Sequence, residues 1–111
     1  MRIATWNVNS VRLRIANVLR FIKEYDIDVI CLQETKTEDN FFPINEFVNM
    51  GMVHYSFRGE KSYNGVAIFS KMQIKDQNFE LWCGYKDTRH NCVTLKNNIK
   101  IHNFYVPAGG D

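Results

Sequence analysis

The sequence has few of the features that mark secreted, membrane or metal-clustered proteins. It contains only three cysteines, and Cys31, Cys83 and Cys92 are spaced neither as a CxxC pair nor as a metal-ligand set. No apolar run approaches the roughly 18 residues that a membrane span needs, and no basic leader precedes an apolar stretch after Met1. We therefore expect reduced thiols, no membrane partner and a cytoplasmic location.

An excess of charge of one sign is also missing, because 14 Lys and Arg nearly balance 12 Asp and Glu and leave a net charge of +2. A total this small neither indicates nor excludes a nucleic-acid partner. The sequence does have 45% apolar and 14% aromatic residues in a length of 111, which is typical of one globular domain with a buried core. No repeat, linker or low-complexity segment divides it.

The chain is organised around residues 28–36, which read DVICLQETK. Residues 29–32 form an unbroken apolar run, which is typical of a strand buried on both faces. The run then gives way to polar residues that include Glu34 and Lys36. A carboxylate and an ammonium therefore follow a buried strand directly, and open α/β sheets bind their ligands at such strand ends.

The residues before this stretch predict a strand and a helix. Residues 2–7 have the pattern of a short strand, and residues 11–25 carry one apolar helical stripe with Ser10 as the N-cap. Strand, helix and strand within about thirty residues form a crossover unit, whose two strands are nearly always parallel in one sheet. If these strands are neighbours, Asn7 and Glu34 meet at the same edge.

The remaining pattern predicts further strands and one short helix. A helix is expected to begin at Pro43 and to be closed by Gly51. Strands are expected at residues 53–58, 65–70, 79–83, 92–96 and 99–106. The last two form a hairpin turned by Asn97 and Asn98. We thus expect an α/β fold with a mixed sheet, in which the long and the short helix cover one face and nothing visible covers the other.

Four separated stretches resemble one known family. They are MRIATWNVNSVRLR at residues 1–14, LQETK at 32–36, YNGVAIFSK at 63–71 and NFYVPAGG at 103–110. In this order they are similar to the exonuclease III type of AP endonuclease, within the endonuclease/exonuclease/phosphatase superfamily. The resemblance implies a DNase I-like, four-layer α/β sandwich with two facing sheets. Residues 1–111 would be a single incomplete domain, the N-terminal half of that sandwich.

The resemblance also implies an activity and its partners. The family hydrolyses DNA phosphodiesters with a divalent metal, usually Mg²⁺, with Mn²⁺ as the alternative. Its members incise DNA 5′ to abasic sites and remove nucleotides or blocking groups from 3′ ends. DNA with abasic sites or 3′ ends is therefore the expected substrate.

The same resemblance assigns candidate catalytic residues. Glu34 is the implied metal-binding carboxylate, Asn7 is the amide beside it, and Tyr105 contacts the scissile phosphate. Mg²⁺ prefers oxygen ligands and keeps several waters, so one carboxylate and a substrate phosphate can hold it weakly. Asn9 and Ser10 stand where the family often has Asp or Asn followed by Gly, so Asn9 is expected at most as an outer contact to a metal-bound water.

Four further residues correspond to DNA-facing positions in the family, and they are Arg12, Lys36, Tyr63 and Asn64. Arg and Lys would neutralise phosphates, and Tyr63 would press into the duplex groove or stack near it. An ordinary solvated surface remains the alternative interpretation for all four.

The family is much longer than this chain, and its second half supplies groups that this sequence lacks. Those groups are a GDxN motif that handles the attacking water, a further aspartate and the histidine of a terminal Ser-Asp-His. His54, His90 and His102 stand in no such context. Because water activation needs a general base, we expect this chain alone to be inactive. It is either one part of a longer or split enzyme, or a remnant that binds DNA or metal weakly.

A second enzyme class within the superfamily remains as an alternative. Secreted nucleases and phosphoinositide or sphingomyelin phosphatases share an Asn near the start and a Glu in the second strand. The QETK and YNGVAIFSK strings and the lack of a secretion signal favour the DNA-repair branch.

Overall fold

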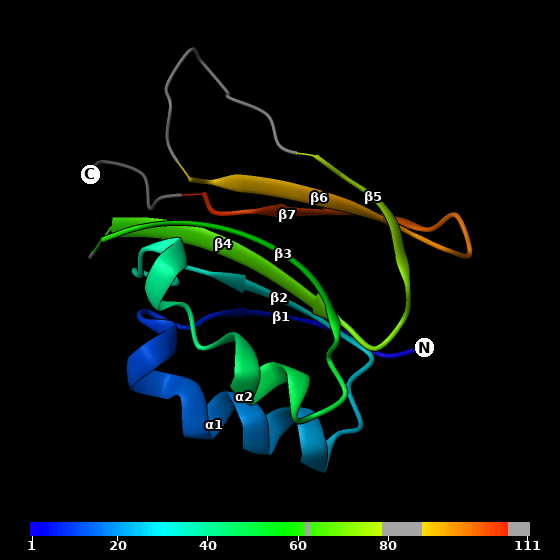
Figure 1. Cartoon of the computed structure of the whole chain (residues 1–111), viewed down its shortest axis with the longest axis horizontal. Coiled ribbons are helices and arrows are strands. Elements are labelled where there is room, and N and C mark those ends of the chain that lie inside the picture. Colours follow the sequence, from blue (N-terminus) through cyan, green and yellow to red (C-terminus); the bar gives the residue numbers. More distant parts are fainter. Residues whose placement is uncertain (62, 79–87, 107–111) are drawn as a thin grey trace.

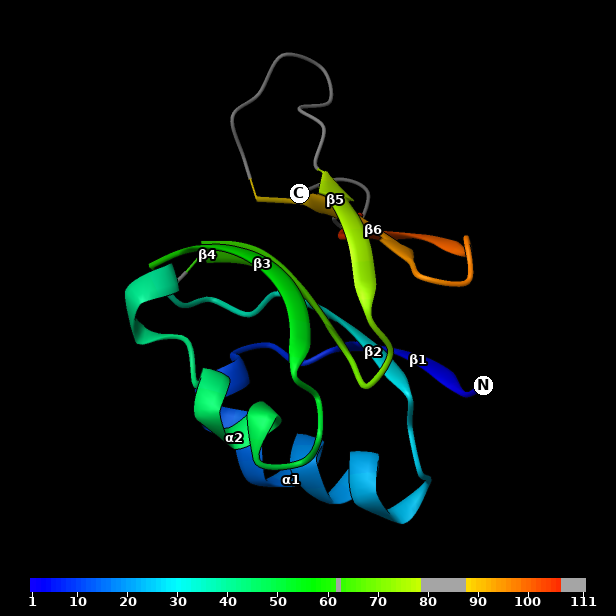
Figure 2. The ribbon, with the colours of Figure 1, turned by 45° about the vertical axis from the view of Figure 1, so that its right-hand side comes forward.

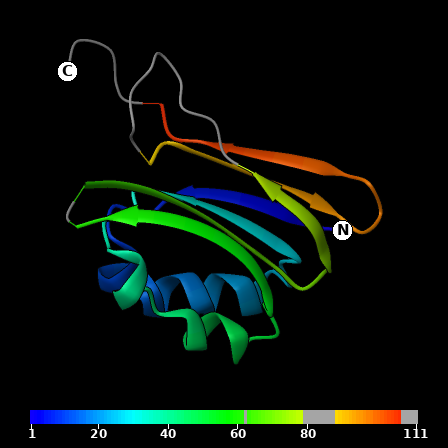
Figure 3. The same cartoon turned by 45° about the horizontal axis from the view of Figure 1, so that its top comes forward.

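The computed structural model describes residues 1–61, 63–78 and 88–106. The elements in chain order are β1 (Ile3–Asn7), α1 (Val11–Glu24), β2 (Val29–Gln33), the 3₁₀ turn η1 (Asp39–Phe41), α2 (Ile44–Val48), β3 (His54–Glu60), β4 (Tyr63–Ser70), β5 (Ile74–Asn78), β6 (His90–Leu95) and β7 (Lys100–Phe104). They form a helical layer, a four-stranded sheet and a three-stranded sheet (Figures 1 and 3). Within the described residues, no helix has the length and apolar character of a membrane span.

The crossover unit at the start of the chain is present. β1 and β2 are parallel neighbours, in register from Ile3 opposite Val29 to Asn7 opposite Gln33. The first sheet has the strand order β1-β2-β4-β3, with β4 antiparallel to both of its neighbours. Ser10 caps α1 by accepting a hydrogen bond from the Leu13 amide at 3.3 Å. The predicted parallel pairing of β1 with β2 and the predicted N-cap of α1 are thus confirmed.

The helices cover one face of the first sheet (Figure 1). Val18 and Ile22 of α1 are fully buried against this face. A group of phenylalanines fills the space under α2, where the rings of Phe47 and Phe69 stack at 4.0 Å and those of Phe42 and Phe57 at 4.5 Å. The helical layer therefore gains much of its stability from aromatic packing.

The expectation that nothing in the chain covers the other face of this sheet is wrong. The second sheet, in the order β5-β6-β7, packs on it (Figure 2). The residues between the sheets are Val29, Cys31, Ile68, Val93 and Leu95. Ile30 and Leu32 alternate with Val29 and Cys31 along β2 and face the helices, so every residue of this strand is buried.

The second sheet was only partly predicted. The hairpin of β6 and β7 is confirmed, although β6 begins earlier, at His90. Its turn is closed by a hydrogen bond of 2.8 Å from the Leu95 amide to the Ile99 carbonyl, and only Asn98 of the two asparagines has a positive φ, at 71°. β5 was not predicted, because IKDQN has no apolar alternation. The strand expected at residues 79–83 lies outside the described residues.

We predict that Phe69→Ala destabilises the chain by about 3–5 kcal/mol, because it empties a fully buried site between stacked rings. Urea unfolding followed by circular dichroism measures the loss. Phe41→Ala is the matched control, since that ring is 61% exposed and its removal should change the free energy of unfolding by no more than about 0.5 kcal/mol. Equal losses in the two variants would contradict this assignment of the core.

Candidate active site

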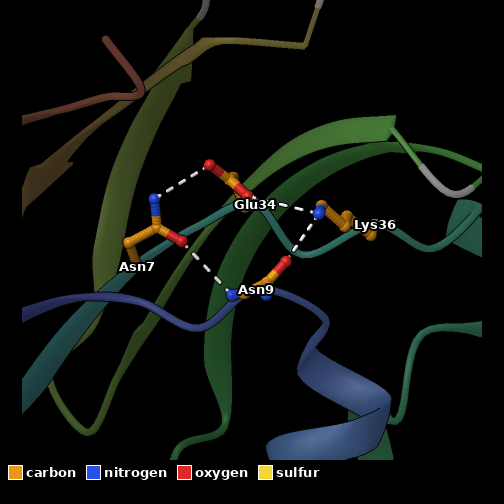
Figure 4. A network of polar contacts seen from close by, with 4 residues as sticks. All are labelled: Asn7, Asn9, Glu34 and Lys36. Atoms are coloured by element: carbon orange, nitrogen blue, oxygen red, sulfur yellow. Dashed lines mark hydrogen bonds and ion pairs between the residues drawn. The ribbon is translucent and has the colours of Figure 1, made fainter. Parts of the chain in front are cut away.

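The carboxyl ends of β1 and β2 form one edge of the first sheet, and the backbone joins them beyond the last ladder pair. The Val8 amide donates to the Gln33 carbonyl at 3.0 Å, and the Ser10 amide donates to the Glu34 carbonyl at 2.8 Å. These bonds hold the two chain segments together where the strands end. As a result the Asn7 side chain reaches Glu34, with Nδ2 3.1 Å from Oε1 (Figure 4).

Four residues form a closed polar ring at this edge through their side chains and the backbone amide of Asn9 (Figure 4). Besides the Asn7–Glu34 bond, Glu34 Oε2 lies 3.4 Å from Lys36 Nζ. Lys36 Nζ donates to Asn9 Oδ1 at 2.5 Å, and the Asn9 amide donates to Asn7 Oδ1 at 3.2 Å. The ring holds one carboxylate and one ammonium, and two neutral amides complete it.

The backbone of this edge is held in an uncommon conformation. Asn9, Glu34 and Lys36 have φ values of 45°, 54° and 53°, in the left-handed region. Such a conformation costs roughly 1–2 kcal/mol for a residue with a Cβ, and it persists only where surrounding contacts enforce it. Here the Ser10–Glu34 bond and a bond of 2.8 Å from the Lys36 amide to the Asn64 carbonyl enforce it. Clustered strain of this kind is typical of functional sites.

Glu34 is held as a carboxylate by its neighbours. The hydrogen bond from Asn7 lowers the pKa of Glu34 most, and the Tyr105 and Lys36 side chains lower this pKa further, against a desolvation effect that raises it. Tyr105 follows β7, and its amide donates to the Arg89 carbonyl at 2.8 Å. The three candidate catalytic residues therefore meet, with Asn7 and Tyr105 both hydrogen-bonded to Glu34.

The four candidate DNA-facing residues are placed less uniformly. Arg12 is exposed on the first turn of α1, and Lys36 is one third exposed beside Glu34. Asn64 is buried, at 4% exposure, and its Nδ2 has no hydrogen-bond partner among the described residues. Tyr63 begins β4, and its side chain lies outside the described part of the structure. DNA contacts by these residues remain predictions.

Two residues of this region were missed by the sequence reasoning. Gln33 and Asn103 are buried amides in the layer between the sheets, and Gln33 Nε2 donates to Asn103 Oδ1 at 2.7 Å. The sequence could have indicated both residues, because each is an amide that faces the other sheet in a strand whose other residues on that face are apolar. Both residues lie within stretches that carry the resemblance, LQETK and NFYVPAGG, but the resemblance assigned a role to neither of them.

The ring has the chemistry of a hard-cation site. Among the described residues, no three His, Cys, Asp or Glu side chains gather as a metal cluster, and Glu34 is the one carboxylate of the ring. An ionised carboxylate with amide oxygens nearby fits Mg²⁺, which accepts few protein ligands and keeps its waters. Lys36 already neutralises Glu34, so a divalent ion would compete with that ammonium.

The fold is an α/β sandwich with a polar site at the edge of its first sheet, and comparison with known proteins identifies its family. Residues 4–108 match the model of the Endonuclease/Exonuclease/phosphatase family, and the chain belongs to that family. It is 31% identical over 110 residues to an exodeoxyribonuclease of Bacillus subtilis, covering 96% of this chain and 43% of the relative. The chain thus spans less than half the length of that relative.

Solved structures agree with this assignment. An AP endonuclease from Archaeoglobus fulgidus is 41% identical and superposes with a TM-score of 0.87, covering 96% of this chain and 42% of its own. The 3′ phosphatase NExo from Neisseria, solved with a product DNA hairpin, is 34% identical with a TM-score of 0.86, covering 95% of this chain and 41% of its own. The expected DNase I-like fold and the exonuclease III resemblance are therefore confirmed.

We predict that Gly65→Ala is more damaging than Gly51→Ala. Both glycines have positive φ, at 99° and 88°, so both variants lose about 1 kcal/mol or more from backbone strain. Only at Gly65 would the new Cβ also meet another group, Thr35 Oγ1 at 2.0 Å. Urea unfolding should show an additional loss of about 1–3 kcal/mol at Gly65. Equal losses would mean that Thr35 is not held against this glycine.

We also predict that Asn7→Ala raises the pKa of Glu34 toward its ordinary value, because it removes the largest lowering cause. A depressed folded-state pKa means that ionised Glu34 stabilises the fold at neutral pH, and this contribution is lost as pH falls through that pKa. Carboxyl ¹³C NMR titration of Glu34 measures the shift. Asn45→Ala, on the exposed side of α2, should leave the titration unchanged, and an unaltered Glu34 in Asn7→Ala would refute the prediction.

Proposed function

We propose that this chain supplies the metal-binding side of a nuclease active site that hydrolyses DNA phosphodiesters at abasic sites and 3′ ends. The meeting of Asn7 and Tyr105 on the carboxylate of Glu34 carries the proposal. The described activities of its relatives support it, since they include an AP endonuclease, an exodeoxyribonuclease and a 3′ phosphatase bound to DNA.

Each of the three candidate catalytic residues would have its own role. Glu34 would hold Mg²⁺, or Mn²⁺ as the alternative, and the bound ion would polarise a phosphoryl oxygen and offset the negative charge of the transition state. Asn7 orients the carboxylate through Nδ2. Tyr105 has a hydroxyl that can donate to a phosphate oxygen as well as to Glu34.

Binding of the DNA backbone would fall to the basic residues near the ring. Lys36, beside Glu34, and Arg12, exposed at the start of α1, can neutralise phosphates and so fix the position of the strand. Tyr63 and Asn64 remain candidates for the same surface. We also propose the cytoplasm as the compartment, because the described cysteines, Cys31 and Cys92, are reduced thiols.

The groups that activate water would come from the second half of the family's domain, in this polypeptide or in a separate chain. The described part of this chain places no second carboxylate in the ring with Glu34 that could act as a general base. The relatives are more than twice as long as the matched region, which leaves room for such groups. Residues 1–111 alone would then bind metal or DNA weakly and turn over no substrate.

We predict that the purified 111-residue chain does not incise an abasic-site duplex in the presence of Mg²⁺. A chimera that joins it to the remainder of the Bacillus subtilis exodeoxyribonuclease should incise the duplex. Glu34→Ala should reduce that rate by about 10² to 10³-fold, because transition-state charge loses its stabilisation. Gel analysis of a labelled duplex measures the rates.

The matched control for this test is Glu24→Ala, which removes an exposed carboxylate at the end of α1 and should leave the rate of the chimera unchanged. Incision by the 111-residue chain that Glu34→Ala abolishes would refute the need for a second half. A chimera that hydrolyses a phosphoinositide and spares the abasic duplex would favour the other branch of the superfamily.

A further inference from the structure

Asn103 joins the two sheets next to the candidate site. Its side chain is 2% exposed, and Nδ2 donates to the carbonyls of Leu32 and Ala67, both at 3.0 Å. Its Oδ1 accepts the Gln33 Nε2 donor at 2.7 Å. One side chain of β7 is thereby bonded to β2 and β4 of the first sheet, and three of its hydrogen-bonding positions are filled.

The place of these bonds along the chain connects them to the site. Asn103 precedes Tyr105 by two residues, and the Tyr105 amide extends the pairing with β6 just beyond β7 by donating to the Arg89 carbonyl at 2.8 Å, so the two residues lie on the same face. On the opposite sheet, Leu32 and Gln33 directly precede Glu34. The amide therefore ties the segment that carries Tyr105 to the segment that carries Glu34.

Side-chain packing between β7 and the first sheet is incomplete near Asn103. β1 and β7 are edge strands in the described structure, and a cleft of about 270 Å³ lies between the sheets there. Thr5, Gln33 and Asn103 are among the residues that line it. In such an incompletely filled layer, directional hydrogen bonds contribute strongly to where the strand lies relative to the first sheet.

We propose that Asn103, together with Gln33, is a positioning residue that sets the hydroxyl of Tyr105 against the carboxylate of Glu34. The role rests on the proposed function, in which these two groups act on one phosphate. An amide suits it because one short side chain must donate twice and accept once. Asp would lose both donors, and Leu would remove one donor from each of the two buried carbonyls and one acceptor from Gln33 Nε2, which also donates to Thr5 Oγ1 at 2.8 Å.

Asn91 provides a matched control. It lies opposite Asn103 on β6 and is equally buried, at 0% exposure. Its Nδ2 also crosses between the sheets, but it donates to the Ser56 carbonyl of β3 at 2.9 Å. If the effect came from a general loss of hydrogen bonds between the sheets, replacing either asparagine would produce it. If Asn103 positions Tyr105, only the replacement of Asn103 affects the contact between Tyr105 and Glu34.

The experiment measures the contact between Tyr105 and Glu34 directly. The 111-residue chain is labelled with ¹³Cζ-tyrosine, and the Tyr105 resonance is identified by its disappearance in Tyr105→Phe. The change in this resonance caused by Glu34→Gln is then compared in the wild-type, Asn91→Leu and Asn103→Leu backgrounds. We expect Glu34→Gln to change the Tyr105 resonance clearly in the wild-type and Asn91→Leu backgrounds, and most of that change to be lost in Asn103→Leu.

A full response in Asn103→Leu would overturn the proposal, as would an equal loss in Asn91→Leu or no response in the wild-type chain. If amide spectra show that Asn103→Leu does not fold, Gln33→Met takes its place, because it removes the Gln33 donor and keeps the two bonds of Asn103 Nδ2. Retention of the full response in Gln33→Met would then overturn it. The measurement needs neither metal nor DNA, so a failure of the proposed nuclease function would leave its result intact.

Discussion

β2 is buried on both faces, and the other elements lie where that burial requires them. Ile30 and Leu32 need an apolar partner on one side, which the helices provide, and Val29 and Cys31 need one on the other, which the second sheet provides. β1 and β4 satisfy the backbone of the same strand from either side. Where the apolar run ends, the chain emerges at the sheet edge with Glu34. The site is thus placed by the end of a strand that is buried along its whole length.

The layer between the sheets changes character along its length. At one end it is apolar, around Val29, and its contribution to stability is non-directional. Toward the candidate site it contains the buried amides Gln33, Asn91 and Asn103, whose bonds have defined partners and directions. Apolar packing favours the association of the sheets, while amide bonding specifies how they are aligned. The alignment matters most at this end, because β7 leads to Tyr105.

The charges and hydrogen bonds of the ring fit a chain that belongs to a metal-dependent family. The hydrogen bond from Asn7 is the largest of several contacts that keep Glu34 ionised, and Lys36 balances its charge. A carboxylate that is already ionised and oriented is suited to a cation, which would have to compete with Lys36 for it. The left-handed backbone at Glu34 and Lys36 is tolerated because the amide of Ser10 and the carbonyl of Asn64 hold it in place. Membership of the Endonuclease/Exonuclease/phosphatase family agrees with this arrangement.

Local pattern by itself determined the elements whose partners lie nearby in the chain. The stripe of α1, its Ser10 cap and the parallel pairing of β1 with β2 followed from periodicity and crossover geometry, and so did the meeting of Asn7 with Glu34. Only the tertiary structure decided what covers the second face of β2 and how Tyr105 reaches Glu34. Those contacts join residues far apart in the chain, as Gln33 and Asn103 show at a separation of 70 residues. A residue pattern encodes which positions are buried, but it does not encode which distant element buries them, because that choice depends on how the sheets pack together.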